Sequence, residues 1–410
     1  MTIKLITKYT PWLFLLTAII TGFRHTYSNP FSTTVCYAIY SFFIYIAFRW
    51  VLYNRHRIDR TMTLYIFYFI WIIICIIRGF LVADNYWEYK NCYNNSLALL
   101  LPIISTIFII PQFCNKILRT YFKWCIPLSL LCLPFFLYFS WYWYFYPFIA
   151  LVVLFPAIKH KWLYLIFTGF ICFLDIYSRS PILKFIAAIC CGYLVYLSYP
   201  VKYYLCKYIT ILVYVLSMTL LILGITGVFN IFKMDEYLPS DMQKDKNLIE
   251  DTRTWIYTEV ITSAYNNDYI VWGRTPARGF DTTFNIVLEN IETMSQMTKD
   301  KVKSERFGCE INFLNIFTWT GLLGVILLSL IYIRASFIAL LYSNNSYIKV
   351  LGLYIAFRFL YGWIEDITSF DSNSLTLWLL ISFCLSPFFR QMNNSEFKQF
   401  VKYTICLNHK

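Results

Sequence analysis

Long apolar runs recur along almost the whole chain and are separated only by short polar segments. Most of the runs are about long enough to cross a hydrocarbon layer roughly 30 Å thick. A soluble core could not bury this much apolar surface, because 59% of the 410 residues are hydrophobic and only 14% are charged. The sequence therefore predicts a polytopic membrane protein.

Helices are the expected spanning elements. A membrane-spanning backbone must satisfy its own hydrogen bonds, so it forms either helices or a closed barrel. The runs are continuous rather than alternating, which favours an all-α fold. We expect about twelve transmembrane helices, near residues 11–23, 31–53, 62–82, 96–113, 122–140, 141–157, 162–178, 182–199, 205–228, 311–334, 347–364 and 374–389. The boundary between the two helices expected within 122–157 is the least distinct, since little of the sequence between them resembles a turn.

This pattern divides the chain into four parts. Residues 1–228 hold helices one to nine, 229–309 form a long polar loop, 310–390 hold the last three helices, and 391–410 form a tail. Within the loop, apolar residues recur at helical spacing in NLIEDTRTWIYTEVITSAY and in TTFNIVLENIETM. We expect two short amphipathic helices, which serve either as a cap on the bundle or as a lid over a polar substrate.

The basic residues of the short loops predict the orientation. With twelve spans, all of these Lys and Arg groups fall on one side, so both termini are expected in the cytoplasm and the long loop outside. The loop carries ten Lys or Arg against thirteen Asp or Glu, so its net charge is −3 and the rest of the chain carries +16. The total of +13 then reflects topology, and nucleic acid is not an expected partner.

Cysteine and histidine offer little chemistry. The thirteen Cys lie mostly singly inside apolar runs, no CxxC occurs, and the four His are scattered. We expect no cofactor and no obligatory metal, although an acidic loop residue such as Asp281 could bind one. The first apolar run is interpreted as a retained helix rather than as a cleaved signal peptide.

Several arginines break the one-sided pattern. An arginine at membrane depth costs a few kcal/mol, so it usually faces a wet cavity or a partner. Arginines on the outer face indicate an anionic ligand, and the planar guanidinium fork matches a phosphate group. ATP is not expected outside the membrane, so a lipid diphosphate is the predicted anion. The arginines concerned are Arg78, Arg179, Arg253, Arg274, Arg278, Arg306 and Arg358.

Two of these arginines have partners that the sequence suggests. Asp175 and Arg179 are four residues apart and would share one helix face, which leaves an ion pair and an anion contact both open. Glu365 and Asp366 follow Arg358 by about two helical turns. An ion pair between buried Arg358 and either carboxylate is therefore the structural alternative to a ligand contact.

Glu310 lies at the mouth of an apolar run, directly after the long loop. A carboxylate on the first residues of a helix is held rigidly and can accept a proton from a hydroxyl group. The alternatives are an ion pair with Arg306, four residues earlier, or a cap of the helix start.

Three patches resemble the O-antigen polymerase and O-antigen ligase superfamily of polytopic membrane glycan enzymes. They are SRSP, then RTWIY followed by WGRTPARGF, and then EINFLNIFTWTGLLG. The resemblance implies substrate contacts by Arg179, Arg253 and Glu310, and by either Arg278 or Arg274. Ligases typically have His at the position of Glu310, so the resemblance favours a polymerase.

The resemblance implies a bacterial inner-membrane enzyme. It would transfer a glycan from undecaprenyl diphosphate to a lipid-linked acceptor at the outer face, as in the synthesis of O-antigen, capsule or exopolysaccharide. The lipid-linked oligosaccharide and membrane lipid are then the expected partners, together with a chain-length regulator and a flippase. An O-antigen ligase remains one alternative. A transporter of lipid-linked saccharides is another, although the single long loop breaks the internal symmetry that transporters often have.

Overall fold

The structure, a computed structural model, describes residues 3–26, 30–53, 62–132, 142–174, 179–225, 252–282, 305–366 and 369–405. These parts are almost entirely helical, as the sequence predicts. The elements up to the long loop are α1 (Ile3–Thr26), α2 (Pro30–Tyr53), α3 (Thr63–Val82), α4 (Tyr86–Leu100), η3 (Leu101–Ile104), α5 (Ser105–Phe108), α6 (Pro111–Cys132), α7 (Tyr142–Ala150), η5 (Leu151–Ala157), α8 (Lys161–Leu174), α9 (Arg179–Tyr193), η6 (Leu194–Tyr196) and α10 (Tyr199–Ile225). The later ones are α11 (Thr252–Asn266), β1 (Phe280–Asp281), β2 (Glu305–Arg306), α14 (Asn312–Tyr342), α15 (Ser346–Tyr361), α16 (Ser372–Leu385), α17 (Pro387–Gln391) and α18 (Asn394–Ile405).

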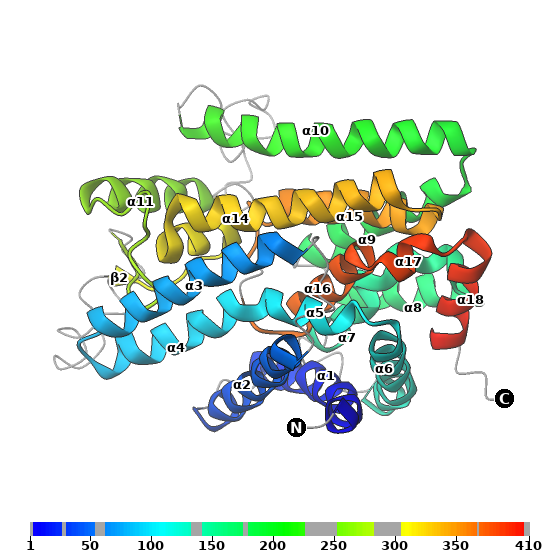
Figure 1. The fold of residues 1–410 in the computed structure, drawn as a ribbon, viewed down its shortest axis with the longest axis horizontal. Helices are drawn as coiled ribbons and strands as arrows, with labels where there is room; N and C mark the ends of the chain where they lie inside the picture. Colours follow the sequence, from blue (N-terminus) through cyan, green and yellow to red (C-terminus); the bar gives the residue numbers. More distant parts are fainter. Residues whose placement is uncertain are drawn as a thin grey trace.

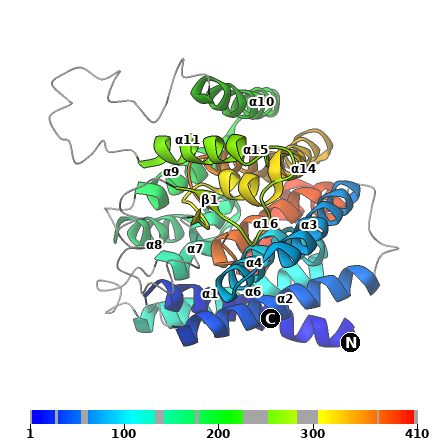
Figure 2. The same cartoon turned by 90° about the vertical axis from the view of Figure 1, so that its left-hand side faces the viewer.

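The helices form layers around α14, α15 and α16. Helices α14 and α15 lie side by side, with α10 against α15 and α3 against α14 (Figure 1). Helices α1, α2 and α6 form a further layer, which also appears in the turned view (Figure 2). Every side chain of α16 is buried. Helix α16 therefore lies at the centre of the described fold.

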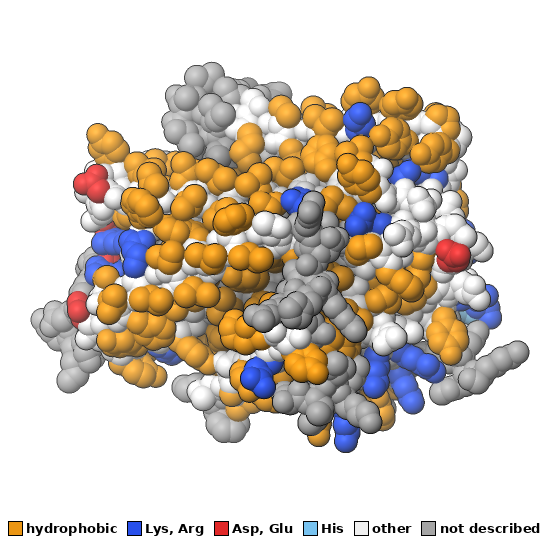
Figure 3. Space-filling view, in the orientation of Figure 1, with side chains coloured by type: hydrophobic (Ala, Val, Ile, Leu, Met, Phe, Trp, Pro, Cys, Tyr) orange, Lys and Arg blue, Asp and Glu red, His pale blue; other side chains and the backbone are white. Residues whose placement is uncertain are grey.

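The surface of the described helices is largely apolar. Figure 3 shows hydrophobic side chains across most of one face, with acidic groups at its two ends and Lys and Arg groups scattered over it. On α3, Ile66, Ile70 and Ile77 are each more than half exposed. Exposed aliphatic groups on this scale are typical of a surface that contacts lipid rather than water. The fold is therefore compatible with a multi-pass membrane protein.

The expected count of twelve spans does not agree with the structure. Four of the described helices are long and apolar enough to cross a membrane: Thr34–Tyr53, Thr63–Val82, Tyr199–Thr219 and Asn312–Tyr342. Tyr86–Phe108 with Pro111–Trp124 would add a fifth, but the chain bends by 109° between them. Four other apolar helices are shorter, at 10–17 residues: Phe145–Ala157, Lys161–Phe173, Ser180–Tyr196 and Ser372–Leu385.

The physical reason for the lower count is helix length. At about 1.5 Å per residue, a helix of 14 residues such as α16 extends only about 21 Å, which is less than the hydrocarbon layer. Helical turns of the 3₁₀ type also interrupt several runs, including η3 after α4 and η5 after α7. Apolar composition predicted burial in these segments, but it did not predict where the helices break.

The first predicted loop helix corresponds to α11. Its residues Ile256 and Val260 pack with Phe280, Ile311 and Leu314 in a small separate core. The second predicted loop helix, near residues 284–291, lies outside the described residues. The sequence did not indicate the short antiparallel pair of β1 and β2, which aligns Phe280 with Arg306.

Candidate functional site

The loop segment 269–282 docks on a break in α14. Gly321 has φ 69° and ψ −173°, which interrupts the helix and frees backbone groups that an unbroken helix would pair. The loop segment satisfies two of them: Arg274 N donates to Thr318 O at 2.7 Å, and Leu322 N donates to Ile270 O at 2.9 Å. The break therefore serves as the anchor of the loop.

Helix α3 also holds this loop segment. Arg78 donates from Nη1 to the carbonyl oxygen of Trp272 at 2.7 Å and from Nη2 to that of Gly273 at 3.2 Å. Trp71 donates from Nε1 to Thr320 O at 3.0 Å, directly before the break. The structure thus gives Arg78 backbone partners in the loop.

Glu305 joins the two loop arginines that the sequence could not separate. Arg278 Nε lies 3.0 Å from each carboxylate oxygen of Glu305, and Arg274 Nη2 lies 3.1 Å from Oε1. Glu305 also accepts from Gly279 N at 3.0 Å, and it is buried. Hydrogen bonding to Glu305 raises the pKa of Arg278 above its usual value. Arg274 and Arg278 therefore form one network around a single buried carboxylate.

Asp281 closes this network on its outer side. Arg274 Nη1 lies 2.8 Å from Oδ1 of Asp281, and Asn267 Nδ2 lies 2.7 Å from Oδ2. Burial acts to raise the pKa of Asp281, but the hydrogen bonds from Arg274, Asn267 and Ser263 outweigh it and lower the pKa below its usual value. Within the described residues, no group of three or more His, Cys, Asp or Glu side chains could hold a metal ion.

Glu310 lies just before the start of α14 and forms an ion pair with Arg306. Arg306 Nη2 lies 2.6 Å and 2.8 Å from the two carboxylate oxygens. The side chain of Glu310 is 62% exposed, whereas that of Arg306 is only 17% exposed. The carboxylate is therefore fixed on one side by a guanidinium and exposed on the other.

Helix α4 presents a row of asparagines. Asn85 caps the helix by accepting hydrogen bonds from the backbone N–H groups of Trp87 and Glu88. Asn91, Asn94 and Asn95 follow at spacings of three and four residues, so they share one face of the helix. Asn95 donates to Pro276 O at 2.9 Å, which ties this face to the loop segment.

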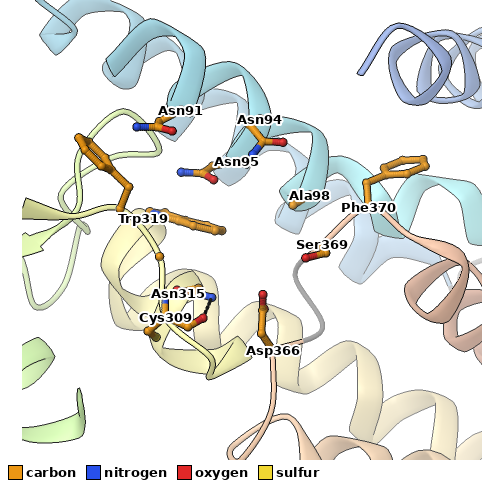
Figure 4. Close-up of a pocket in the computed structure, with 12 residues that line it drawn as sticks. Asn91, Asn94, Asn95, Ala98, Cys309, Asn315, Trp319, Asp366, Ser369 and Phe370 are labelled. Carbon is orange, nitrogen blue, oxygen red and sulfur yellow. Dashed lines mark hydrogen bonds between the residues drawn. The ribbon is translucent and has the colours of Figure 1, made fainter. Parts of the chain in front are cut away.

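A polar pocket of about 250 Å³ lies between this face of α4 and the beginning of α14. The three asparagines form one wall, and Trp319, Asn315, Asp366 and Ser369 lie opposite and beside them (Figure 4). Asn315 is committed to the chain, because its amide bonds both the N–H and the carbonyl oxygen of Cys309. Phe307, Gly308 and Cys309, the three residues before Glu310, line the same pocket.

A second polar centre is buried between α9 and the end of α15. Lys184 forms an ion pair with Glu365, and Ser180 Oγ donates to Glu365 Oε1 at 2.6 Å. The Lys184 ammonium also lies 5.0 Å from the ring centroids of both Tyr146 and Tyr361. Arg358 is fully buried nearby and donates to Asn373 Oδ1 at 3.1 Å. Buried charge of this kind is costly and must be paired.

The predicted site residues thus fall into separate groups. Arg274 and Arg278 lie in the loop network, Glu310 pairs with Arg306, and Asp366 lines the pocket. Glu365 belongs to the buried centre with Lys184, a partner that the sequence did not suggest. Asp175 and the side chains of Arg179 and Arg253 lie outside the described residues.

Sequence reasoning overlooked three features of the site. Lys184 could have been noticed, because it is a lone cation inside an apolar helix. The asparagine row on α4 also carries a signal, since Asn is unusual at helical spacing on a buried face. Glu305 offered no local signal, because its role depends on two arginines in a distant part of the loop.

Comparison with known proteins adds no relative. No protein-family model matches the chain, and no curated protein or solved structure matches it either.

Proposed function

We propose that the chain is a polysaccharide repeat-unit polymerase, which transfers a glycan from undecaprenyl diphosphate to a lipid-linked acceptor at the outer face of a bacterial inner membrane. One observation carries the proposal. The exposed carboxylate of Glu310 pairs with Arg306 beside a polar pocket, where an arginine-bearing loop meets apolar helices. A lipid-linked saccharide needs such a junction, since its chain requires an apolar surface and its head group a polar one.

The residues match the chemistry of this transfer. An acceptor hydroxyl oxygen forms a bond to the anomeric carbon of the donor, and the bond from that carbon to the diphosphate oxygen breaks. The hydroxyl proton goes to Glu310, and undecaprenyl diphosphate leaves with the electron pair. Guanidinium groups stabilise the negative charge of the leaving group. The reaction needs no nucleotide sugar and no cofactor.

The loop arginines supply the diphosphate site in this proposal. Arg274 and Arg278 share the Glu305 carboxylate. Diphosphate oxygens would replace carboxylate oxygens around these groups, since both acceptors fit the same guanidinium fork. Arg179 and Arg253 remain further proposed contacts. A flippase that delivers the substrate and a chain-length regulator are proposed partners.

The decisive experiment is polymerisation by purified protein. The protein is incubated with an undecaprenyl-diphosphate-linked repeat unit, and the products are separated on a gel. The proposal predicts a ladder of chain lengths. A single product, formed only when a second acceptor lipid is added, would instead support the ligase. Unchanged substrate would contradict both enzymes.

A transporter of lipid-linked saccharides is a second proposed function, favoured by the buried centre of Lys184, Glu365 and Arg358. Buried ion pairs between helices are common where ions or protons drive transport. Proteoliposomes that hold labelled lipid-linked saccharide in one leaflet would test it. Movement of the label to the other leaflet, lost in Lys184→Met, would support transport.

A further inference from the structure

We infer that the pocket between α4 and α14 is a binding site for an uncharged saccharide, in which hydroxyl groups are recognised by Asn91, Asn94 and Ser369 beside the ring of Trp319. The inference rests on the proposed function for the place of the saccharide in the reaction. The site itself is derived from the pocket alone.

The first reason is the supply of uncommitted polar groups. The amides of Asn91 and Asn94 and the hydroxyl of Ser369 form no hydrogen bond with the described part of the chain, and all three line the pocket. Amide and hydroxyl groups that line a pocket without a partner are available to a ligand that donates to them or accepts from them.

The second reason is the type of these groups. An amide offers both donors and acceptors, and so does a hydroxyl group. A sugar hydroxyl also donates and accepts, so it matches this wall at each position. A phosphate only accepts and an ammonium only donates, and either would leave half of the amide groups unused.

The third reason is charge. Asp366 is the only charged side chain among the described residues that line the pocket, and no Lys or Arg joins it. An acidic sugar or a diphosphate would face this carboxylate in a pocket that no described Lys or Arg lines. The pocket therefore favours a neutral saccharide and leaves the diphosphate to the arginines of the loop.

The shape of the pocket agrees with this assignment. Trp319 lines the pocket opposite the asparagines, and its aromatic ring can cover an apolar face of a sugar ring (Figure 4). The volume of about 250 Å³ is below the range of roughly 300–1,000 Å³ that holds drug-sized ligands. A single sugar unit is therefore a better fit than the whole repeat unit or a prenyl chain.

The test measures binding of three probes to purified protein. They are a short prenyl diphosphate, the same lipid carrying N-acetylglucosamine, and the same lipid carrying glucuronic acid. Wild-type protein should bind the neutral glycolipid more tightly than either of the others. Asn91→Ala with Asn94→Ala should lower affinity for the neutral glycolipid by roughly tenfold to a hundredfold, since each lost hydrogen bond is worth about 1 kcal/mol. Affinity for the bare prenyl diphosphate should not change.

Two further variants support the interpretation of this experiment. Asn344→Ala makes the same change in an exposed residue that follows the other end of α14, so it should bind all probes normally. Asn94→Asp keeps the size of the side chain and removes two donors, so it should weaken neutral glycolipid binding without loss of folded protein. Equal losses for all three probes, no loss in the pocket variants, or equal binding of the acidic glycolipid would each overturn the inference.

The binding and polymerisation experiments together distinguish failure of the saccharide site from failure of the proposed reaction. Sugar-dependent binding without a polymer ladder would contradict the polymerase and keep the saccharide site. A ladder together with unchanged glycolipid binding in the double variant would contradict the saccharide site alone.

Discussion

Gly273 and Gly321 meet backbone to backbone, one in the loop segment and the other at the break in α14. Both have positive φ, 70° and 69°, which side chains of L-residues rarely adopt. A Cβ atom on Gly273 would overlap the backbone of Thr320 and Gly321, and one on Gly321 would overlap Val271. This contact fixes how the arginine-bearing loop sits on the helices.

The first prediction follows from this contact. Gly321→Ala should release the loop segment, because an extended backbone with positive φ is essentially confined to glycine and the added methyl group cannot fit. Limited trypsin digestion should then cleave after Arg274 or Arg278, as read by mass spectrometry. Gly308→Ala is the matched control, since its added Cβ would lie 3.7 Å from the nearest atom, Asn315 Oδ1. Equal protection of Gly321→Ala and wild-type protein would refute the anchor.

The second prediction concerns Glu310 as proton acceptor. Glu310→Gln keeps the size of the side chain but cannot accept the proton, so polymer formation should fall by roughly 10²–10⁴. Because the side chain is 62% exposed, expression and binding of the lipid-linked substrate should persist. Polymer yield and substrate binding are measured on the same preparation. A full ladder from the Gln variant would leave Glu310 as a structural partner of Arg306 only.

The third prediction separates binding from structure at Arg278. Arg278→Lys keeps the charge but loses the planar fork, so both the Glu305 contact and any diphosphate contact should weaken. Product formation should fall even where trypsin protection of the loop is retained. Glu305→Gln is the companion variant, which should lower loop protection by removing a buried charged partner. Wild-type product levels in Arg278→Lys would show that the guanidinium serves only the loop.

The fourth prediction is a loss of loop docking in acid. The pKa of Asp281 lies below its usual value of 3.8 in the folded protein. Its hydrogen bonds therefore contribute stability that is fully present above about pH 4 and is lost as the pH falls through the lowered folded value. Resistance of the loop to pepsin should decrease over that range. Asp281→Asn should lack this step, and an identical pH profile in the variant would exclude Asp281 as its cause.

The fifth prediction addresses orientation. A topology reporter fused after Lys246 should be exposed outside the cytoplasm, and one fused after Lys161 should be cytoplasmic, because the short-loop Lys and Arg are sorted to one side. Lys246 lies outside the described residues. A cytoplasmic signal from the Lys246 fusion would remove the proposed outer active face.

The sequence by itself determined the class of fold and showed which charged residues lie at unusual places beside or within the apolar runs. Apolar runs, few charged residues and the isolated position of Glu310 are local properties, so they could be recognised without knowing which helices touch. The start of α14 at Asn312 and the helix α11 follow from the same periodic pattern. The number of membrane-spanning helices did not follow from this pattern, because the 3₁₀ turns and the 109° bend depend on packing between neighbouring helices.

Only the tertiary structure decided which charges and amides meet. Lys184 of α9 pairs with Glu365, which follows α15. Arg274 and Arg278 converge on Glu305, and the asparagines of α4 face Trp319 of α14. Each of these relations joins segments far apart in the chain. Burial of a side chain is encoded by its local pattern, but its partner is selected by long-range packing and by the need to satisfy every buried polar group.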